Sequence, residues 1–72
     1  MKYIKTVGIY EICEASKEEC KKGYMGMMWE YPCFCVFYKD EEPDEKTPRI
    51  IGMSESDFGT IEEAENWCKE YS

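Results

Sequence analysis

Five cysteines are the residues with the clearest chemical potential in this sequence: Cys13, Cys20, Cys33, Cys35 and Cys68. Thiolates bind zinc and act as nucleophiles. A cysteine nucleophile usually needs a histidine base, and the sequence contains no histidine. Structural zinc sites usually take thiolates from C-x2-4-C pairs at turns. Here six residues separate Cys13 from Cys20, and Cys33 and Cys35 lie in the middle of a predicted strand. We therefore interpret the thiols as buried apolar groups and predict neither a metal nor another cofactor.

Carboxylates are the second group that could do chemistry. The chain has 16 acidic residues against nine lysines and arginines, a formal net charge of −7. Residues 1–39 hold six lysines and five acids, a net charge of +1, so residues 40–72 carry −8. Acid–base catalysis needs a carboxylate with a shifted pKa in a concave site, whereas these acids fall in a loop and on exposed helix positions. The pattern predicts a solvated acidic surface and no enzyme, and residues 40–44 do not match a calcium-binding loop.

The element that organises the rest of the chain is the nearly uncharged run from Met27 to Tyr38. Residues 33–38 are apolar or aromatic at every position. Because a strand alternates its side chains between two faces, this pattern predicts an inner strand that is covered on both faces. Pro32 cannot donate to a β-ladder, so the strand is expected to begin near Cys33.

The segment before this run supplies a strand and a short helix. Residues 2–14 are rich in β-branched and aromatic types and predict one strand, with a bulge or a close backbone approach at Gly8. Residues 16–22 predict a helix of about two turns, with Ser16 and Glu19 as a capping box. A tight polar loop is the alternative for this segment.

The acidic second half predicts a loop, a strand and a helix. Residues 39–48 contain two prolines and five acids, which is typical of a hairpin loop. Residues 49–53 predict a short third strand, and residues 54–59 predict a turn with Phe58 pointing inward. Residues 61–71 predict an amphipathic helix that follows a capping box and packs a tryptophan-bearing stripe on the sheet.

Together these elements predict an α+β fold in a single domain of residues 1–72. Its three-stranded antiparallel sheet would be packed on one face by the C-terminal helix. The other face would be an interface, for a homodimer or another protein, or would lie under the acidic loop and residues 15–23. The odd number of cysteines and the absence of a leader-like apolar segment predict a reduced, cytoplasmic protein, and no run is long enough to span a bilayer.

From Trp29 onward the chain resembles the arm-type DNA-binding domain of tyrosine recombinases, the phage and transposon integrases. The resemblance is carried by a strand, the start of a hairpin and a capped helix: Trp29, Tyr31, Val36, Tyr38, Asp40, Phe58, Thr60, Glu63, Ala64 and Trp67. It implies a three-stranded sheet that reads DNA with lysines and arginines along its hairpin. Acids occupy those hairpin positions here, so the cations needed for counterion release are missing and direct nucleic-acid binding is not expected.

The charge pattern favours a small acidic protein-binding module, not an enzyme, that occludes the basic, nucleic-acid-binding surface of a partner protein. Inhibitors from phages and mobile elements, including anti-CRISPR proteins, are similar in size and charge. The predicted partner-binding residues are three aromatic anchors and two groups of acids: Trp29, Tyr31, Phe34, Asp40, Glu41, Glu42, Asp44, Glu45, Glu62, Glu63 and Glu65. A divergent integrase-type nucleic-acid-binding domain and a structural homo-oligomer are the alternatives.

Overall fold

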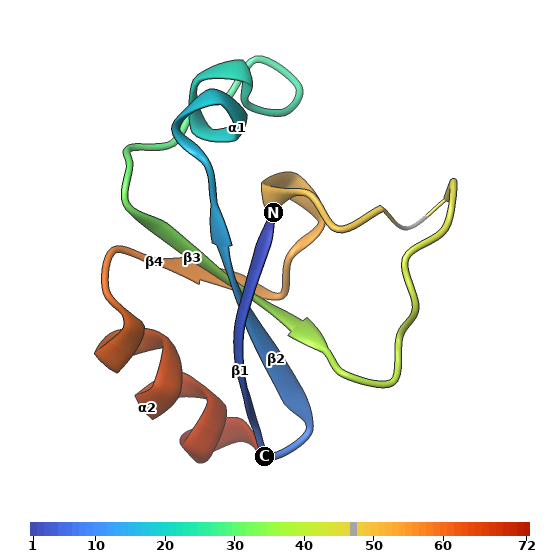
Figure 1. Cartoon of the computed structure of the whole chain (residues 1–72), viewed down its shortest axis with the longest axis vertical. Coiled ribbons are helices and arrows are strands. Elements are labelled where there is room, and N and C mark those ends of the chain that lie inside the picture. Colours follow the sequence, from blue (N-terminus) through green and yellow to red (C-terminus); the bar gives the residue numbers. More distant parts are fainter. Residues whose placement is uncertain (47) are drawn as a thin grey trace.

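The computed structural model describes residues 1–46 and 48–72, which form an antiparallel sheet with a C-terminal helix packed on it (Figure 1). The strands are β1 (Lys2–Val7), β2 (Tyr10–Ala15), β3 (Cys33–Tyr38) and β4 (Ser56–Phe58), and they neighbour one another in sequence order. The helices are α1 (Lys17–Lys22) and α2 (Ile61–Tyr71), with a short 3-10 helix, η1 (Ile51–Met53). The predicted α+β class is confirmed, with four strands in place of three.

The single strand predicted over residues 2–14 is wrong, because this segment folds back on itself as the β1–β2 hairpin. Gly8 has a φ of +62° and makes the turn, while the bulge lies between Tyr3 and Lys5. Thirteen extended residues would span about 43 Å. The longest extent of the folded chain is only 30 Å. A β-carbon on Gly8 would lie 2.7 Å from the side chain of Ser72, so the C-terminus packs closely on this turn.

The third strand predicted over residues 49–53 is also wrong. Ile51, which is 5% exposed, turns into the core at the start of η1. Gly52 lies against the ring of Tyr24, which leaves no room for a β-carbon. The last strand is β4, inside the predicted turn, where Phe58 is half-buried as expected. Packing of this segment against residues distant in sequence therefore overrides its local strand pattern.

Both predicted helices are confirmed. At α1 the hydroxyl of Ser16 accepts from the Glu19 N–H at 3.1 Å, and the Glu19 carboxylate accepts from the Ser16 N–H at 3.0 Å. At α2 the hydroxyl of Thr60 accepts from the Glu63 N–H at 3.2 Å and donates to the Glu63 carboxylate at 3.0 Å. These contacts satisfy backbone N–H groups that a helix leaves free at its start. Within the described residues, no helix combines the length and apolar character that crossing a bilayer requires.

Strand β3 lies inside the sheet, and both of its faces are buried, as its sequence predicts. On one face α2 closes a cluster that we call the helix core: Tyr10, Ile12, Phe34, Val36, Ala64 and Cys68. On the other face α1, Trp29 and η1 close the thiol core: Cys13, Ala15, Cys20, Cys33, Cys35, Phe37 and Ile51. The sheet face that was expected to be free for a homodimer is therefore covered.

Candidate functional site

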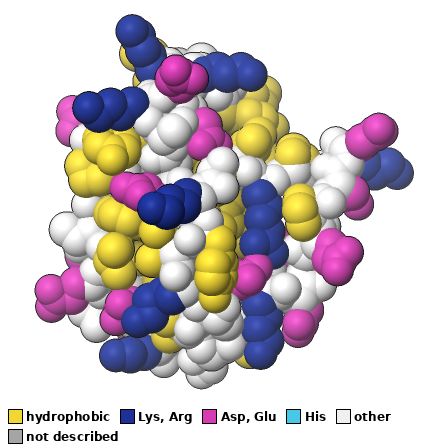
Figure 2. All heavy atoms as spheres, viewed as in Figure 1, with side chains coloured by type: hydrophobic (Ala, Val, Ile, Leu, Met, Phe, Trp, Pro, Cys, Tyr) yellow, Lys and Arg dark blue, Asp and Glu magenta, His cyan; other side chains and the backbone are white. Residues whose placement is uncertain are grey.

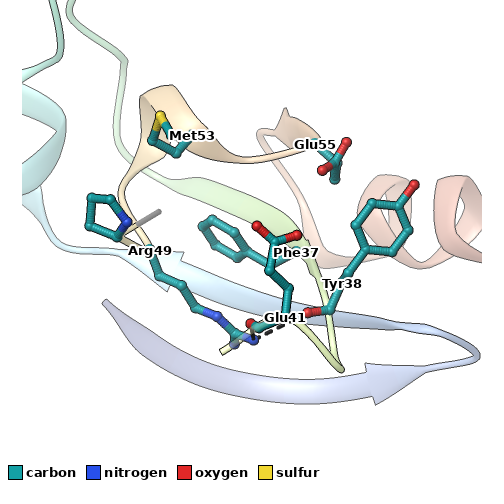
Figure 3. Close-up of a pocket in the computed structure, with 7 residues that line it drawn as sticks. Phe37, Tyr38, Glu41, Arg49, Met53 and Glu55 are labelled. Atoms are coloured by element: carbon teal, nitrogen blue, oxygen red, sulfur yellow. Dashed lines mark hydrogen bonds between the residues drawn. The ribbon is translucent and has the colours of Figure 1, made fainter. Parts of the chain in front are cut away.

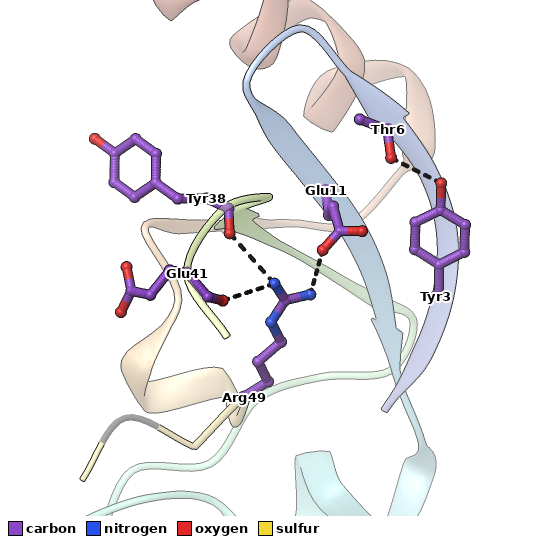
Figure 4. Close-up of polar contacts among 6 residues, drawn as sticks. All are labelled: Tyr3, Thr6, Glu11, Tyr38, Glu41 and Arg49. Atoms are coloured by element: carbon purple, nitrogen blue, oxygen red, sulfur yellow. Dashed lines mark hydrogen bonds and ion pairs between the residues drawn. The ribbon is translucent and has the colours of Figure 1, made fainter. Parts of the chain in front are cut away.

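Arg49 ties the acidic loop, residues 39–48, to the sheet (Figure 4). Its Nη1 donates to the Glu11 carboxylate on β2 at 2.6 Å. Its Nη2 donates to the backbone carbonyls of Tyr38 at 3.2 Å and Glu41 at 3.0 Å. The guanidinium carbon also lies 5.4 Å from the centre of the Phe37 ring, in a cation–π contact. This one side chain therefore fastens the start of the loop to two strands, and we call the contact the arginine clasp.

The arginine clasp is electrically balanced and largely enclosed. The side chains of Arg49 and Glu11 are 20% and 23% exposed. Burial acts to lower the pKa of Arg49, but its hydrogen bond to Glu11 and the charge of that carboxylate outweigh burial and leave the pKa raised. An enclosed charge that lost its partner would be costly, so each of these two residues depends on the other.

The five acids of the loop extend from this clasp into solvent. All five are exposed: Asp40, Glu41, Glu42, Asp44 and Glu45. In the space-filling view, acidic side chains gather where the loop extends from the body of the molecule, at the right of the picture (Figure 2). The carboxylate of Asp44 accepts from the Lys46 N–H at 2.8 Å and folds the far part of the loop. The clasp thus anchors the start of a loop that presents five like charges to solvent.

A small cavity of about 20 Å³ opens between the acidic loop and η1 (Figure 3). The residues that line it are Phe37, Tyr38, Glu41, Pro48, Arg49, Met53 and Glu55. Glu41 approaches it from the loop and Glu55 from the segment before β4. A volume of this size accommodates roughly one water-sized group. The cavity is therefore too small for a substrate.

Four aromatic rings run from the start of the acidic loop to the end of α2. In the order Tyr38, Tyr10, Trp67 and Tyr71, successive ring centres are 5.1, 5.0 and 4.8 Å apart. The Tyr10 hydroxyl donates to the backbone carbonyl of Tyr71 at 3.2 Å, which fixes the end of α2 on the sheet. Tyr38 and Tyr71 are 39% and 57% exposed, whereas Tyr10 is buried. This aromatic ladder leaves Tyr38 accessible beside the acidic loop and Tyr71 accessible at the far end of α2.

The three predicted aromatic anchors do not join this surface. Phe34 is 8% exposed and belongs to the helix core, so it has no surface to offer a partner. Trp29 is half-buried against the thiol core. Tyr31 is 47% exposed, with the Lys17 ammonium 5.3 Å from its ring centre at the α1 end of the molecule. An aromatic-rich segment predicts burial and anchoring equally well, and only packing distinguishes the two.

The acids of α2 lie apart from those of the loop, on opposite sides of the molecule in Figure 1. Glu63 is engaged with Thr60 at the start of the helix. Glu65 pairs with Lys5 of β1 at 2.9 Å. Glu62 is exposed and contributes only to the general negative charge. The structure therefore brings together the five predicted loop acids and leaves the three helix acids outside the group.

No family model matches this chain, and neither does any curated protein or any solved structure. The resemblance to integrase arm-type domains consequently stays a prediction.

Sequence reasoning missed the residue on which this surface depends. Arg49 is the one arginine in the sequence, and it follows a loop with five acids and two prolines. An isolated arginine after an acidic loop is a signal for a clasp, because a guanidinium can serve a carboxylate and backbone carbonyls together. Tyr71 follows Trp67 by one helical turn on α2, yet its side chain is 57% exposed.

The five cysteines are all free and buried, as predicted. The sulfurs of Cys33 and Cys35 lie 3.8 Å apart in the thiol core. Burial raises the pKa of every one of these thiols, that of Cys33 to about 11. Within the described residues no set of three or more histidine, cysteine, aspartate or glutamate side chains is arranged to hold a metal. The thiols therefore pack as small apolar groups within the two cores.

Proposed function

We propose that this chain is a small acidic protein-binding module that occludes the basic surface of a partner protein. The observation that supports the proposal is the arginine clasp, which anchors the start of a loop with five exposed acids beside the exposed Tyr38. We call the combined region the acidic–aromatic surface, and its members are Tyr38, Asp40, Glu41, Glu42, Asp44, Glu45 and Glu55. Carboxylates of this density attract basic surfaces, and tyrosines provide contact area with few rotatable bonds.

Order before binding is what distinguishes this surface from a flexible acidic tail. A loose loop of like charges would have to lose conformational freedom when it met a partner, which weakens binding. The arginine clasp removes part of that freedom in advance. The carboxylates would then steer the encounter and the Tyr38 ring would exclude water from the contact. A partner protein that binds nucleic acid through its basic surface would no longer do so once that surface is covered. A phage or mobile-element inhibitor would act in this way.

Neutralising three acids of the loop is expected to weaken partner binding at least tenfold in low salt, since each exposed charge contributes roughly 0.5–1 kcal/mol. The test variant is Glu41→Gln, Glu42→Gln and Glu45→Gln. Its matched control is Glu18→Gln, Glu30→Gln and Glu62→Gln, which removes the same net charge from exposed positions outside the acidic–aromatic surface. Isothermal titration with a partner captured from host lysate, at two salt concentrations, provides the measurement.

Equal weakening by the two triple variants would show that total charge, and not this surface, attracts the partner. Affinity independent of salt would contradict the electrostatic mechanism directly. Binding of the wild-type chain to duplex DNA at low salt, measured by fluorescence anisotropy, would favour the integrase-type alternative in its place.

A further inference from the structure

A second surface lies at the other end of the molecule, where α1 is followed by a tight hairpin. Tyr24 and Met27 exchange backbone hydrogen bonds of 2.8 and 3.0 Å. Between them Met25 and Gly26 have φ values of +50° and +83°, as in the two-residue turns of β-hairpins. The side chains of Met25, Met27 and Met28 are 85%, 63% and 72% exposed. We call these three residues the methionine tip.

The backbone of the hairpin that carries the methionine tip is held by several contacts with the rest of the fold. The ring of Tyr24 rests on Gly52 of η1. The Trp29 N–H donates to the Cys20 carbonyl at 3.1 Å, and the Trp29 side chain packs on the thiol core. Gly23 approaches the backbone of Met27 so closely that a β-carbon there would overlap it. The backbone is therefore part of the fold, while the three methionine side chains contribute nothing to either core.

Two properties of the methionine tip oppose the stability of an isolated chain. Met25 is the one non-glycine residue with a positive φ among the residues that the structure describes, at a turn position where asparagine or glycine is favoured. Three neighbouring large apolar side chains also stand in water, and contiguous apolar surface of this kind marks an interaction site. Local strain of this sort persists where function requires it.

The charge around the methionine tip indicates what covers it. Residues 16–31 contain three lysines and three glutamates and have no net charge, so the rest of the chain carries the whole −7. In Figure 1 the hairpin and α1 lie at one end of the molecule, and α2 lies at the other. Two copies that meet through their tips therefore keep their acidic regions far apart. A patch without net charge has no net attraction for anionic lipid or a strongly basic partner, whereas two acidic chains that meet there avoid most of their mutual repulsion.

We propose that the methionine tip is the contact between two copies of this chain, related by a two-fold axis. Methionine side chains are flexible and polarizable, so two sets interdigitate without demanding one exact fit. Exposed Tyr31 and the aliphatic stems of Lys21 and Lys22 lie on the same end and extend the buried area toward that of a small, weak interface. The dimer leaves both acidic–aromatic surfaces free, which would make the proposed inhibitor bivalent.

Sedimentation analysis over a concentration series tests the proposal. The wild-type mass should rise toward twice the 8.5 kDa of the chain as concentration increases. The variant Met25→Asn, Met27→Ser and Met28→Ser should remain at the monomer mass throughout, and asparagine suits the positive φ, so folding should persist. The control Ile9→Ser with Ile61→Ser removes two exposed apolar residues outside the hairpin and should dimerise like the wild type. Circular dichroism confirms that each variant is folded.

A wild-type chain that stays monomeric at every concentration would overturn the proposal. Persistence of the dimer in the triple variant, or its loss in the Ile9 and Ile61 control, would place the contact elsewhere and also overturn it. A monomer that instead binds vesicles containing anionic lipid, in a manner lost in the triple variant, would make the occupant a membrane. Methyl resonances of Met25, Met27 and Met28 should shift on dilution, while that of Met53 on η1 should not.

Discussion

Replacing Arg49 with alanine is expected to lower the free energy of unfolding by about 2–3 kcal/mol, somewhat less than breaking a fully buried ion pair. The loss is large because Glu11, 23% exposed, would keep its charge without a partner. The carbonyls of Tyr38 and Glu41 would also lose their charged donor. For a domain of this size the midpoint of thermal unfolding should fall by roughly 10–20 °C. Circular dichroism on heating measures it.

A matched control for this experiment is Lys46→Ala, which removes an exposed cation from the same loop. Its effect should stay within about 0.5 kcal/mol, as for most surface substitutions. A second variant, Glu11→Leu with Arg49→Met, removes both charges and should recover much of the stability, because no unpaired charge remains. This double variant should nevertheless bind the partner more weakly than the wild type, because Arg49 no longer holds its acidic loop. If Arg49→Ala and the Lys46→Ala control had the same midpoint of thermal unfolding, the arginine clasp would not stabilise the fold.

Raising the pH above about 9 is expected to destabilise the fold, because the thiols of an unfolded chain ionise there while those of the folded chain remain protonated. Burial raises the pKa of all five cysteines, that of Cys33 from 9.0 to about 11. In this window the unfolded state binds fewer protons than the folded state, so stability falls as pH rises. Each such thiol removes up to about 1.4 kcal/mol per pH unit.

Urea unfolding at a series of pH values from neutral to 10.5, with a reductant present to prevent disulfides, measures this effect. The contribution of the thiols should be flat below their unfolded pKa and should decline across the alkaline range. The variant Cys35→Ala should start less stable, because it leaves a cavity in the thiol core, but its decline with pH should be shallower by one thiol. If the stability of Cys35→Ala declined with pH as steeply as that of the wild type, the buried thiols would not be the cause. A wild-type urea midpoint that stayed constant up to pH 10.5 would contradict the prediction as well.

Features that depend on neighbours in sequence were predictable. Ser16 with Glu19, and Thr60 with Glu63, start helices through contacts that span three residues. The two-faced apolar pattern of residues 33–38 likewise required cover on both sides, and the structure provides it. The errors fall where two local patterns were equally possible. Gly8 suited a bulge as well as a turn, and residues 49–53 suited a strand as well as the 3-10 helix that the Tyr24 ring and the core select.

The candidate site divides in the same way. The acids of residues 40–45 could be recognised as an exposed group, because no packing interaction competes for them. Which aromatic residues accompany them could not be recognised, since Phe34 and Tyr38 share one strand and one face yet differ in exposure, 8% against 39%. The difference arises because α2 and β4 cover the first and stop short of the second.

The sequence by itself determined the fold class, the two helix starts, the burial of β3 and the concentration of charge in the second half. Only the tertiary structure decided that Arg49 meets Glu11, 38 residues away, and that Glu41 and Glu55 lie beside Tyr38. The physical reason is the separation along the sequence over which each interaction acts. Capping and amphipathic periodicity act within one or two turns of the chain, whereas the arginine clasp depends on strand register and the path of the loop, which form only when the whole sheet assembles.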